Sequence, residues 1–235
     1  MVNVVIRNSK AKRRKQKKSS PENISIRYTV YILLWLSIVL TFFIPYLYTI
    51  NVLDYGNAIA LSSISFSFMF PLIAFTYMLY KGKRLKNIVD ELGISKRKLA
   101  LRYIGMGILL FILFFSLQLI AGIVEYITGY IVSTNVSSTL SNFPLYFYIF
   151  AFLIAPINEE ILFRGFMVPR FGIILSAIIF GAMHYLSYFS IAEFVAALAF
   201  GLAAGYIFKK TQSLYPSIFG HMLFDFVNVL LLLMV

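Results

Sequence analysis

Residues 144–163 read PLYFYIFAFLIAPINEEILF. The stretch is long and apolar enough to cross the hydrocarbon core of a bilayer as a helix, which needs ~20 such residues. Near its end, however, it carries Asn158, Glu159 and Glu160. An ionisable side chain costs ~2.5–3.5 kcal/mol at the centre of a membrane helix. The two adjacent glutamates therefore require a partner or a chemical task.

The whole chain has the composition of a membrane protein. Of its 235 residues, 60% are hydrophobic and only 13% are charged, whereas soluble domains carry about 25% charged residues. The sequence predicts an all-α, polytopic membrane helix bundle with about seven transmembrane helices. The predicted spans are residues 28–50, 57–80, 103–131, 144–163, 171–188, 190–208 and 213–235. Cysteine is absent, which excludes disulfides and thiolate chemistry.

The basic residues predict how the chain is oriented. All 21 Lys and Arg lie before residue 28, within 81–102, at Arg164 and Arg170, or at Lys209 and Lys210. With the N-terminus in the cytoplasm, each of these segments faces the cytoplasm, and the opposite connections contain no Lys or Arg. We therefore expect a multi-pass protein of the cell membrane with its C-terminus outside. The charge is explained by topology and contact with anionic lipid, and no nucleic-acid partner is expected.

Three regions follow from this pattern. Residues 1–27 form a basic cytoplasmic tail before a retained signal anchor, and residues 28–131 contain the first spans with a cytoplasmic loop at 81–101. That loop is either a short amphipathic helix on the membrane surface or a plain charged linker. Residues 132–235 carry the polar groups. Within them, Gly201-x-x-x-Gly205 indicates close helix packing in the bundle or, alternatively, a homodimer contact.

Helical spacing separates the acids of the 144–163 helix. Glu160 and Arg164 are four residues apart, so they share a helix face and predict a structural salt bridge. Glu159 is rotated from Glu160 by about 100° and points elsewhere. A carboxylate that Arg164 does not neutralise can act as a general base, which makes Glu159 the first candidate for catalysis.

Two later helices carry the remaining polar groups. His184 follows Phe180 by one helical turn, and His221, Asp225 and Asn228 form a stripe along the last helix. A single buried histidine can simply hydrogen-bond a neighbouring helix. The combination of acids, one arginine and both histidines of the chain on three helices nevertheless predicts a site. For Glu159 to reach the depth of His184, its helix must extend beyond Arg164, or the next helix must begin after residue 171.

At these residues the sequence resembles the CAAX protease and bacteriocin-processing (CPBP, or Abi) family of intramembrane proteases, which includes the type II CAAX prenyl endopeptidases. The run Glu159-Glu160-Ile161-Leu162-Phe163-Arg164 resembles the Glu-Glu-x-x-x-Arg motif of that family. The run from Phe180 to His184 resembles Phe-x-x-x-His, and the run from His221 to Asp225 resembles His-x-x-x-Asn/Asp. All three occur in the family order within residues 158–225.

The resemblance implies roles for these residues. Glu159 and His184 would activate a water molecule, His221 and residue 225 would stabilise the oxyanion, and Glu160 and Arg164 would hold the helix geometry. Some family members have Asn where this chain has Asp225. An ionised Asp only accepts hydrogen bonds, so either Asp225 is protonated or it orients His221 and leaves Asn228 as the donor.

The resemblance leaves two questions of chemistry open. We favour a mechanism without a cofactor, and the alternative is zinc or another divalent metal held by Glu159, His184 and His221. The expected activity is endopeptidase cleavage of a membrane-delivered peptide or protein, such as a bacteriocin or pheromone precursor, in a bacterium. A catalytically silent regulator or immunity protein that binds a peptide or membrane partner is the main alternative, and a transporter is a third.

Overall fold

The computed structural model describes residues 21–98, 100–128 and 143–234, and the described residues contain helices but no strand. The predicted all-α class is confirmed. Most of the basic tail and most of the predicted connection at 132–143 lie outside the described residues, as does Val235. The elements are α1 (Pro21–Thr49), α2 (Tyr55–Tyr80), α3 (Leu85–Glu91), η1 (Lys96–Lys98), α4 (Arg102–Thr128), α6 (Leu145–Leu153), α7 (Ala155–Glu160), η2 (Ile161–Met167), α8 (Val168–Phe171), α9 (Ile173–Tyr188), α10 (Ile191–Thr211) and α11 (Tyr215–Leu233).

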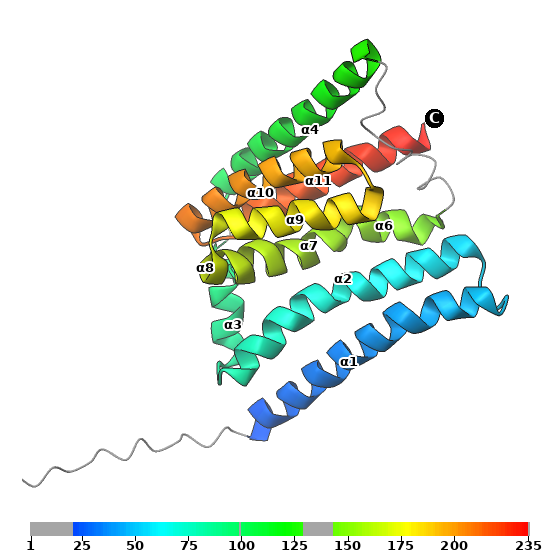
Figure 1. The fold of residues 1–235 in the computed structure, drawn as a ribbon. Helices are drawn as coiled ribbons and strands as arrows, with labels where there is room; N and C mark the ends of the chain where they lie inside the picture. The colour runs from blue at the N-terminus through cyan, green and yellow to red at the C-terminus, as the bar shows by residue number, and fades with distance from the viewer. Residues whose placement is uncertain (1–20, 99, 129–142, 235) are drawn as a thin grey trace, which may run out of the picture.

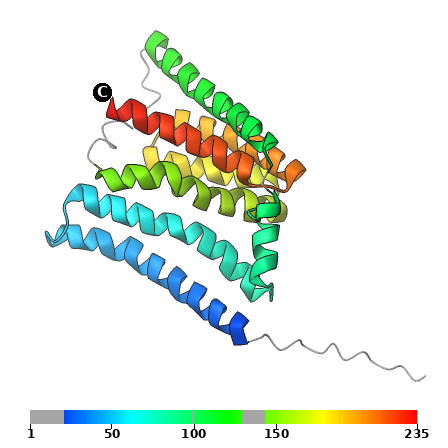
Figure 2. The same ribbon diagram turned by 180° about the vertical axis from the view of Figure 1, so that it is seen from behind.

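The long helices form a bundle in which α1 packs on α2, α9 on α10, and α4 on α11 (Figure 1). Six helical segments of the described chain are long and apolar enough to span a membrane, and α9 is a shorter apolar helix. This agrees with the prediction of about seven membrane helices. The reverse view shows α1 at the edge of the bundle (Figure 2), where apolar side chains such as Trp35 and Phe42 remain exposed, as expected for a lipid-facing helix.

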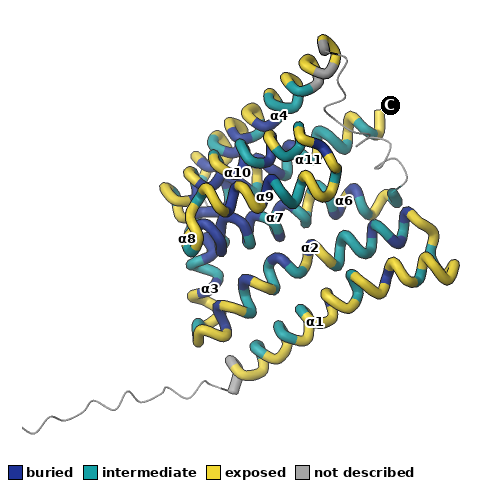
Figure 3. The backbone as a smooth tube through the Cα atoms, viewed as in Figure 1, coloured by how far each residue is buried: buried dark blue, intermediate teal, exposed yellow. Residues whose placement is uncertain are grey.

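Burial is concentrated in the helices that carry the polar groups. The tube coloured by exposure is darkest where α7, its continuation η2 and α10 lie together, and it is mostly yellow along α1 (Figure 3). The core around η2 contains Phe163, Phe180 and Phe200, each at most 2% exposed. The predicted ionisable site thus lies within the packed centre of the bundle.

The helix quoted at the outset differs from the prediction in its length. It continues from α6 through α7 and the π-helical segment η2 to the end of α8 at Phe171. It ends there because Gly172 has φ 85°, a left-handed backbone that favours glycine. The predicted limits 144–163 and 171–188 are therefore corrected to Leu145–Phe171 and Ile173–Tyr188. Twelve residues separate Glu159 from Phe171 and eleven separate Ile173 from His184, so both side chains lie roughly 16–18 Å from the turn.

The loop predicted at 81–101 contains α3 and η1, and α3 lies across the end of the bundle (Figure 1). Its Ile88 and the following Leu92 are fully buried, which agrees with an amphipathic helix rather than a plain linker. Glu91 forms ion pairs with Lys83 and with Arg170 of α8. Partial burial raises the pKa of Glu91, but the two cations outweigh it and hold the pKa below its usual value.

The segment after α3 joins the helices that carry the site. Gly165 of η2 packs so closely on Leu92 that a Cβ atom would lie 2.8 Å from the Leu92 carbonyl oxygen. The Gly93 carbonyl oxygen accepts a hydrogen bond from Leu214 N, at 3.0 Å, just before α11 begins. The Tyr215 hydroxyl donates to the Ile94 carbonyl oxygen at 3.0 Å. These contacts fix η2 and α11 relative to each other at the basic end of the bundle.

Candidate active site

The predicted salt bridge between Glu160 and Arg164 is present. Arg164 Nη1 lies 3.1 Å from Glu160 Oε1, and the two side chains are 1% and 0% exposed. The guanidinium also stacks over the rings of Phe180, at 4.0 Å, and Phe200, at 5.1 Å. The attraction between a cation and an aromatic face is strongest when both groups are removed from water. Arg164 is therefore held by one carboxylate and two rings in the centre of the bundle.

Glu160 has a second partner that the sequence did not reveal. Its Oε1 lies 3.2 Å from Nδ1 of His221 on α11. A carboxylate accepts hydrogen bonds, so this contact requires the proton on Nδ1. The other ring nitrogen, Nε2, faces Glu159 and Asp225. Glu160 therefore links the structural arginine to the orientation of a candidate catalytic histidine.

His184 on α9 is oriented in the same manner by its own helix. Its Nδ1 lies 3.0 Å from the carbonyl oxygen of Phe180, one turn earlier. The carbonyl group only accepts, so the proton again lies on Nδ1 and the lone pair of Nε2 remains available. The Phe180 ring lies 4.4 Å from the His184 ring and 5.8 Å from that of His221, between centroids. Phe180 thus packs against both imidazoles, and its spacing of one turn from His184 places the two rings on one face of α9.

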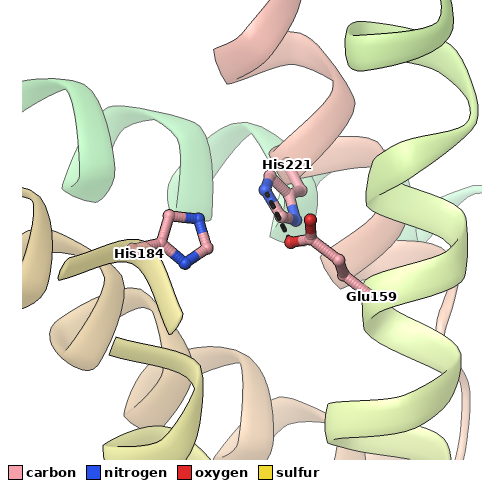
Figure 4. Close-up of side chains that lie close together, drawn as sticks. All are labelled: Glu159, His184 and His221. Atoms are coloured by element: carbon pink, nitrogen blue, oxygen red, sulfur yellow. Dashed lines mark ion pairs between the residues drawn. The ribbon is translucent and has the colours of Figure 1, made fainter. Parts of the chain in front are cut away.

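Three candidate residues from three helices converge. Glu159 of α7, His184 of α9 and His221 of α11 each place one potential ligand atom within 4.8 Å of the others (Figure 4). Glu159 Oε2 lies 3.9 Å from His221 Nε2 and has no hydrogen-bond partner among the described residues. Its side chain is 20% exposed, unlike the fully buried Glu160. The two adjacent glutamates thus occupy different environments, as their rotation about the helix predicted.

The polar stripe predicted on α11 is divided between two places. Asp225 remains at the site, where its Oδ2 lies 3.7 Å from His221 Nε2. Asn228 instead donates through Nδ2 to the Phe224 carbonyl oxygen at 3.1 Å. Its side chain lines a separate cavity of about 420 Å³ with Gln118 and other residues of α4. Asn228 follows His221 by seven residues, so it lies on nearly the same helix face but about 10 Å further along the axis, beyond the groups beside His221.

Two supporting residues were given no role from the sequence. Phe200 of α10 lies beneath both Arg164 and His221, with its ring 5.1 Å from the histidine ring. Asn158 donates through Nδ2 to Ser67 Oγ at 3.1 Å and thereby anchors α7 to α2. Asn158 could be singled out in the sequence as an amide within an apolar run beside the glutamates. Phe200 could not, because the chain contains 24 phenylalanines.

The same three residues are chemically suited to a divalent metal. Two imidazoles and one carboxylate form a known zinc ligand set, and each imidazole has its Nδ1 held by an oxygen acceptor, as metal-binding histidines commonly do. Their ligand atoms lie within 4.8 Å of one another, and ligands about 2 Å from a tetrahedral ion lie about 3.4 Å apart, so a bound ion would draw the three side chains together. The geometry therefore fits a metal as well as it fits a water molecule.

The fold and the site define a class, that of polytopic membrane proteins with a buried Glu/His centre. Residues 141–227 match the family model of the type II CAAX prenyl endopeptidase Rce1-like proteins. This match covers less than half of the chain, and it supports the resemblance to the CAAX protease (CPBP) family of intramembrane proteases that the three motifs indicated. The comparison with curated proteins and the comparison with solved structures gave no match.

Proposed function

We propose that the chain is an intramembrane endopeptidase that hydrolyses a peptide bond in a membrane-delivered peptide or protein. The observation that supports this most directly is the convergence of Glu159, His184 and His221 within 4.8 Å. A peptidase without a covalent intermediate needs a base beside its water and donors where negative charge develops. The family match is consistent with this reaction class.

The proposed reaction begins with a water molecule between Glu159 and Nε2 of His184. Glu159 accepts a proton as the water oxygen attacks the carbonyl carbon of the scissile bond. The tetrahedral intermediate then carries its negative charge on the former carbonyl oxygen. When the C–N bond breaks, the proton passes to the leaving nitrogen, and the products are a carboxylate and an amine.

His221 and Asp225 are assigned to the oxyanion. His221 Nε2 can donate only when the ring carries both protons, and the Glu160 and Glu159 carboxylates lie beside its two nitrogens. Asp225 must be protonated to donate, and otherwise it orients His221. Asn228 lines another cavity, so we do not assign it to the oxyanion.

A divalent metal is the alternative to this mechanism. Glu159, His184 and His221 would hold it, and it would supply an activated water and polarise the substrate carbonyl. The orientation of both imidazoles by Phe180 and Glu160 would serve either mechanism. We favour the reaction without a metal, in which Glu159 is free to act as the base.

The proposed substrate is a peptide that reaches the site from the membrane, such as a bacteriocin or pheromone precursor, or another membrane protein. The second candidate function is a silent regulator or immunity protein that binds such a partner in the same site. The Glu159 carboxylate favours the enzyme, because its buried Oε2 has no hydrogen-bond partner among the described residues, and such an oxygen is costly unless it has a task.

The substitution Glu159→Gln separates the two functions. It keeps the size of the side chain but removes the base, so turnover should fall by about 10²–10⁴ in a membrane-reconstituted cleavage assay. Asp54→Asn is the matched control, because Asp54 caps α2 through Asn57 N and lies in a connection outside the site. If Glu159→Gln keeps full cellular function at normal protein levels, the chain binds without cutting.

A further inference from the structure

A groove separate from the proposed active site lies between α3 and η1. Its volume is about 430 Å³, and it is lined by Leu85, Lys86, Val89, Asp90, Ser95 and Lys96. The wall thus combines two aliphatic side chains, a hydroxyl group and two ammonium groups with a single acid. This mixture of apolar and cationic groups differs from the uniformly apolar surface of the membrane helices.

The cations of the groove are available to a ligand. Both Lys86 and Lys96 are exposed, and neither forms an ion pair with a described residue. Asp90 is the one acid of the wall against two lysines, and the nearby Glu91 is paired with Lys83 and Arg170, so the lining keeps a net positive charge. The Oγ atom of Ser95 is buried and has no hydrogen-bond partner among the described residues, which leaves a donor for an oxygen ligand.

The position of the groove narrows the class of ligand. It lies on α3, which crosses the end of the bundle where the other basic connections also lie (Figure 1). At that level the bilayer presents its headgroups. Cations there attract anionic lipids, whereas Leu85, which is 39% exposed, and Val89 offer contact to the apolar part of a lipid. A free phosphate would use the lysines but not the aliphatic wall.

We propose that the groove between α3 and η1 binds the headgroup of an anionic phospholipid. The phosphate lies between Lys86 and Lys96 and accepts a hydrogen bond from Ser95, and the glycerol region packs on Leu85 and Val89. This inference does not depend on peptidase activity. Because the same segment continues into the contacts of Leu92, Gly93 and Ile94 with η2 and α11, a bound lipid stabilises the end of the bundle.

The test uses the full chain in detergent micelles with added phosphatidylglycerol or phosphatidylcholine, and native mass spectrometry gives the affinity for the first bound lipid. The wild type should prefer phosphatidylglycerol. Each Lys→Gln change, at Lys86 or Lys96, should weaken that preference about fivefold. The matched control is Lys209→Gln with Lys210→Gln, two exposed lysines at the end of α10 that do not line the groove.

A second measurement tests the consequence for stability. A ligand that binds only the folded state raises the unfolding temperature. Phosphatidylglycerol should therefore raise that temperature in the wild type and the control but not in the Lys86→Gln, Lys96→Gln double variant. Circular dichroism of the lipid-free proteins should be the same for all three, which excludes a folding defect.

Three results would overturn the proposal. The double variant could keep the wild-type preference, or the control could lose as much as the double variant, which would indicate general surface charge. Inorganic phosphate added to phosphatidylcholine micelles could raise the unfolding temperature as phosphatidylglycerol does, which would indicate a free-phosphate site. The proposal requires that the lipid bind and that phosphate alone have no such effect.

Discussion

Replacing Arg164 tests whether the buried ion pair is a structural element of the bundle. Arg164→Met removes the charge and keeps an apolar side chain of some length beneath Phe180 and Phe200. It leaves the Glu160 carboxylate, which is 0% exposed, without its cationic partner. Removing one member of a buried pair costs about 3–5 kcal/mol, and the lost stacking of the guanidinium on Phe180 accounts for up to ~2 kcal/mol of such a change.

The assay is unfolding of the purified protein in mixed micelles, followed by circular dichroism. Arg170→Met is the control, because Arg170 lies on the same continuous helix but pairs with the partly exposed Glu91, and such pairs contribute about 0–1 kcal/mol. Glu160→Gln combined with Arg164→Met removes both charges of the pair and should recover most of the lost stability. If Arg164→Met is as stable as the control, or the double variant is less stable than either single variant, the pair is not structural.

Three further predictions concern topology, metal and packing. A reporter fused after Val235 should be active outside the cytoplasm and one within 83–98 inside it, because of the one-sided basic residues, and the reverse pattern contradicts seven spans. Chelation of divalent ions should leave turnover unchanged, whereas loss of activity that zinc restores would show that the site holds a metal. Gly165→Ala should destabilise the protein by about 1–3 kcal/mol in the same unfolding assay, because its Cβ atom would meet the Leu92 carbonyl oxygen at 2.8 Å. Gly105→Ala, with open space around the new Cβ atom, should have little effect.

The sequence predicted the helices well because membrane spans have a simple physical signature, a run of apolar residues of fixed length. It placed the end of the Glu159 helix too early, because Arg164 and Arg170 indicated a cytoplasmic connection, whereas the helix ends only at Gly172, with its positive φ. The π-helical segment at 161–167 also has no hydropathy signal. Local periodicity identifies a helix, but the end of a helix depends on a single backbone conformation.

In the candidate site, the contact within one helix was predicted from the sequence, and the contacts between helices were not. Spacing of four residues correctly paired Glu160 with Arg164, because i and i+4 contacts occur within one helix. The contact of Glu160 with His221 joins residues 61 positions apart, and no periodicity reports on it. The difference between Asp225 and Asn228 likewise depends on which neighbouring helix each side chain faces, and that is set by tertiary packing.

The position of His221 explains why two adjacent glutamates are needed rather than one. Its ring lies between them, with Nδ1 at 3.2 Å from Glu160 and Nε2 at 3.9 Å from Glu159. Oε1 of Glu160 contacts both Arg164 and the Nδ1 proton, and the side chain is 0% exposed, so this carboxylate fixes the ring and is closed to incoming water. Glu159, one residue earlier and about 100° around the helix, faces the same ring from the other nitrogen and is 20% exposed, so water can reach it. One helix turn thus supplies both the carboxylate that orients the histidine, Glu160, and the carboxylate proposed as the base, Glu159. Each role depends on the position of its carboxylate, so neither glutamate can replace the other.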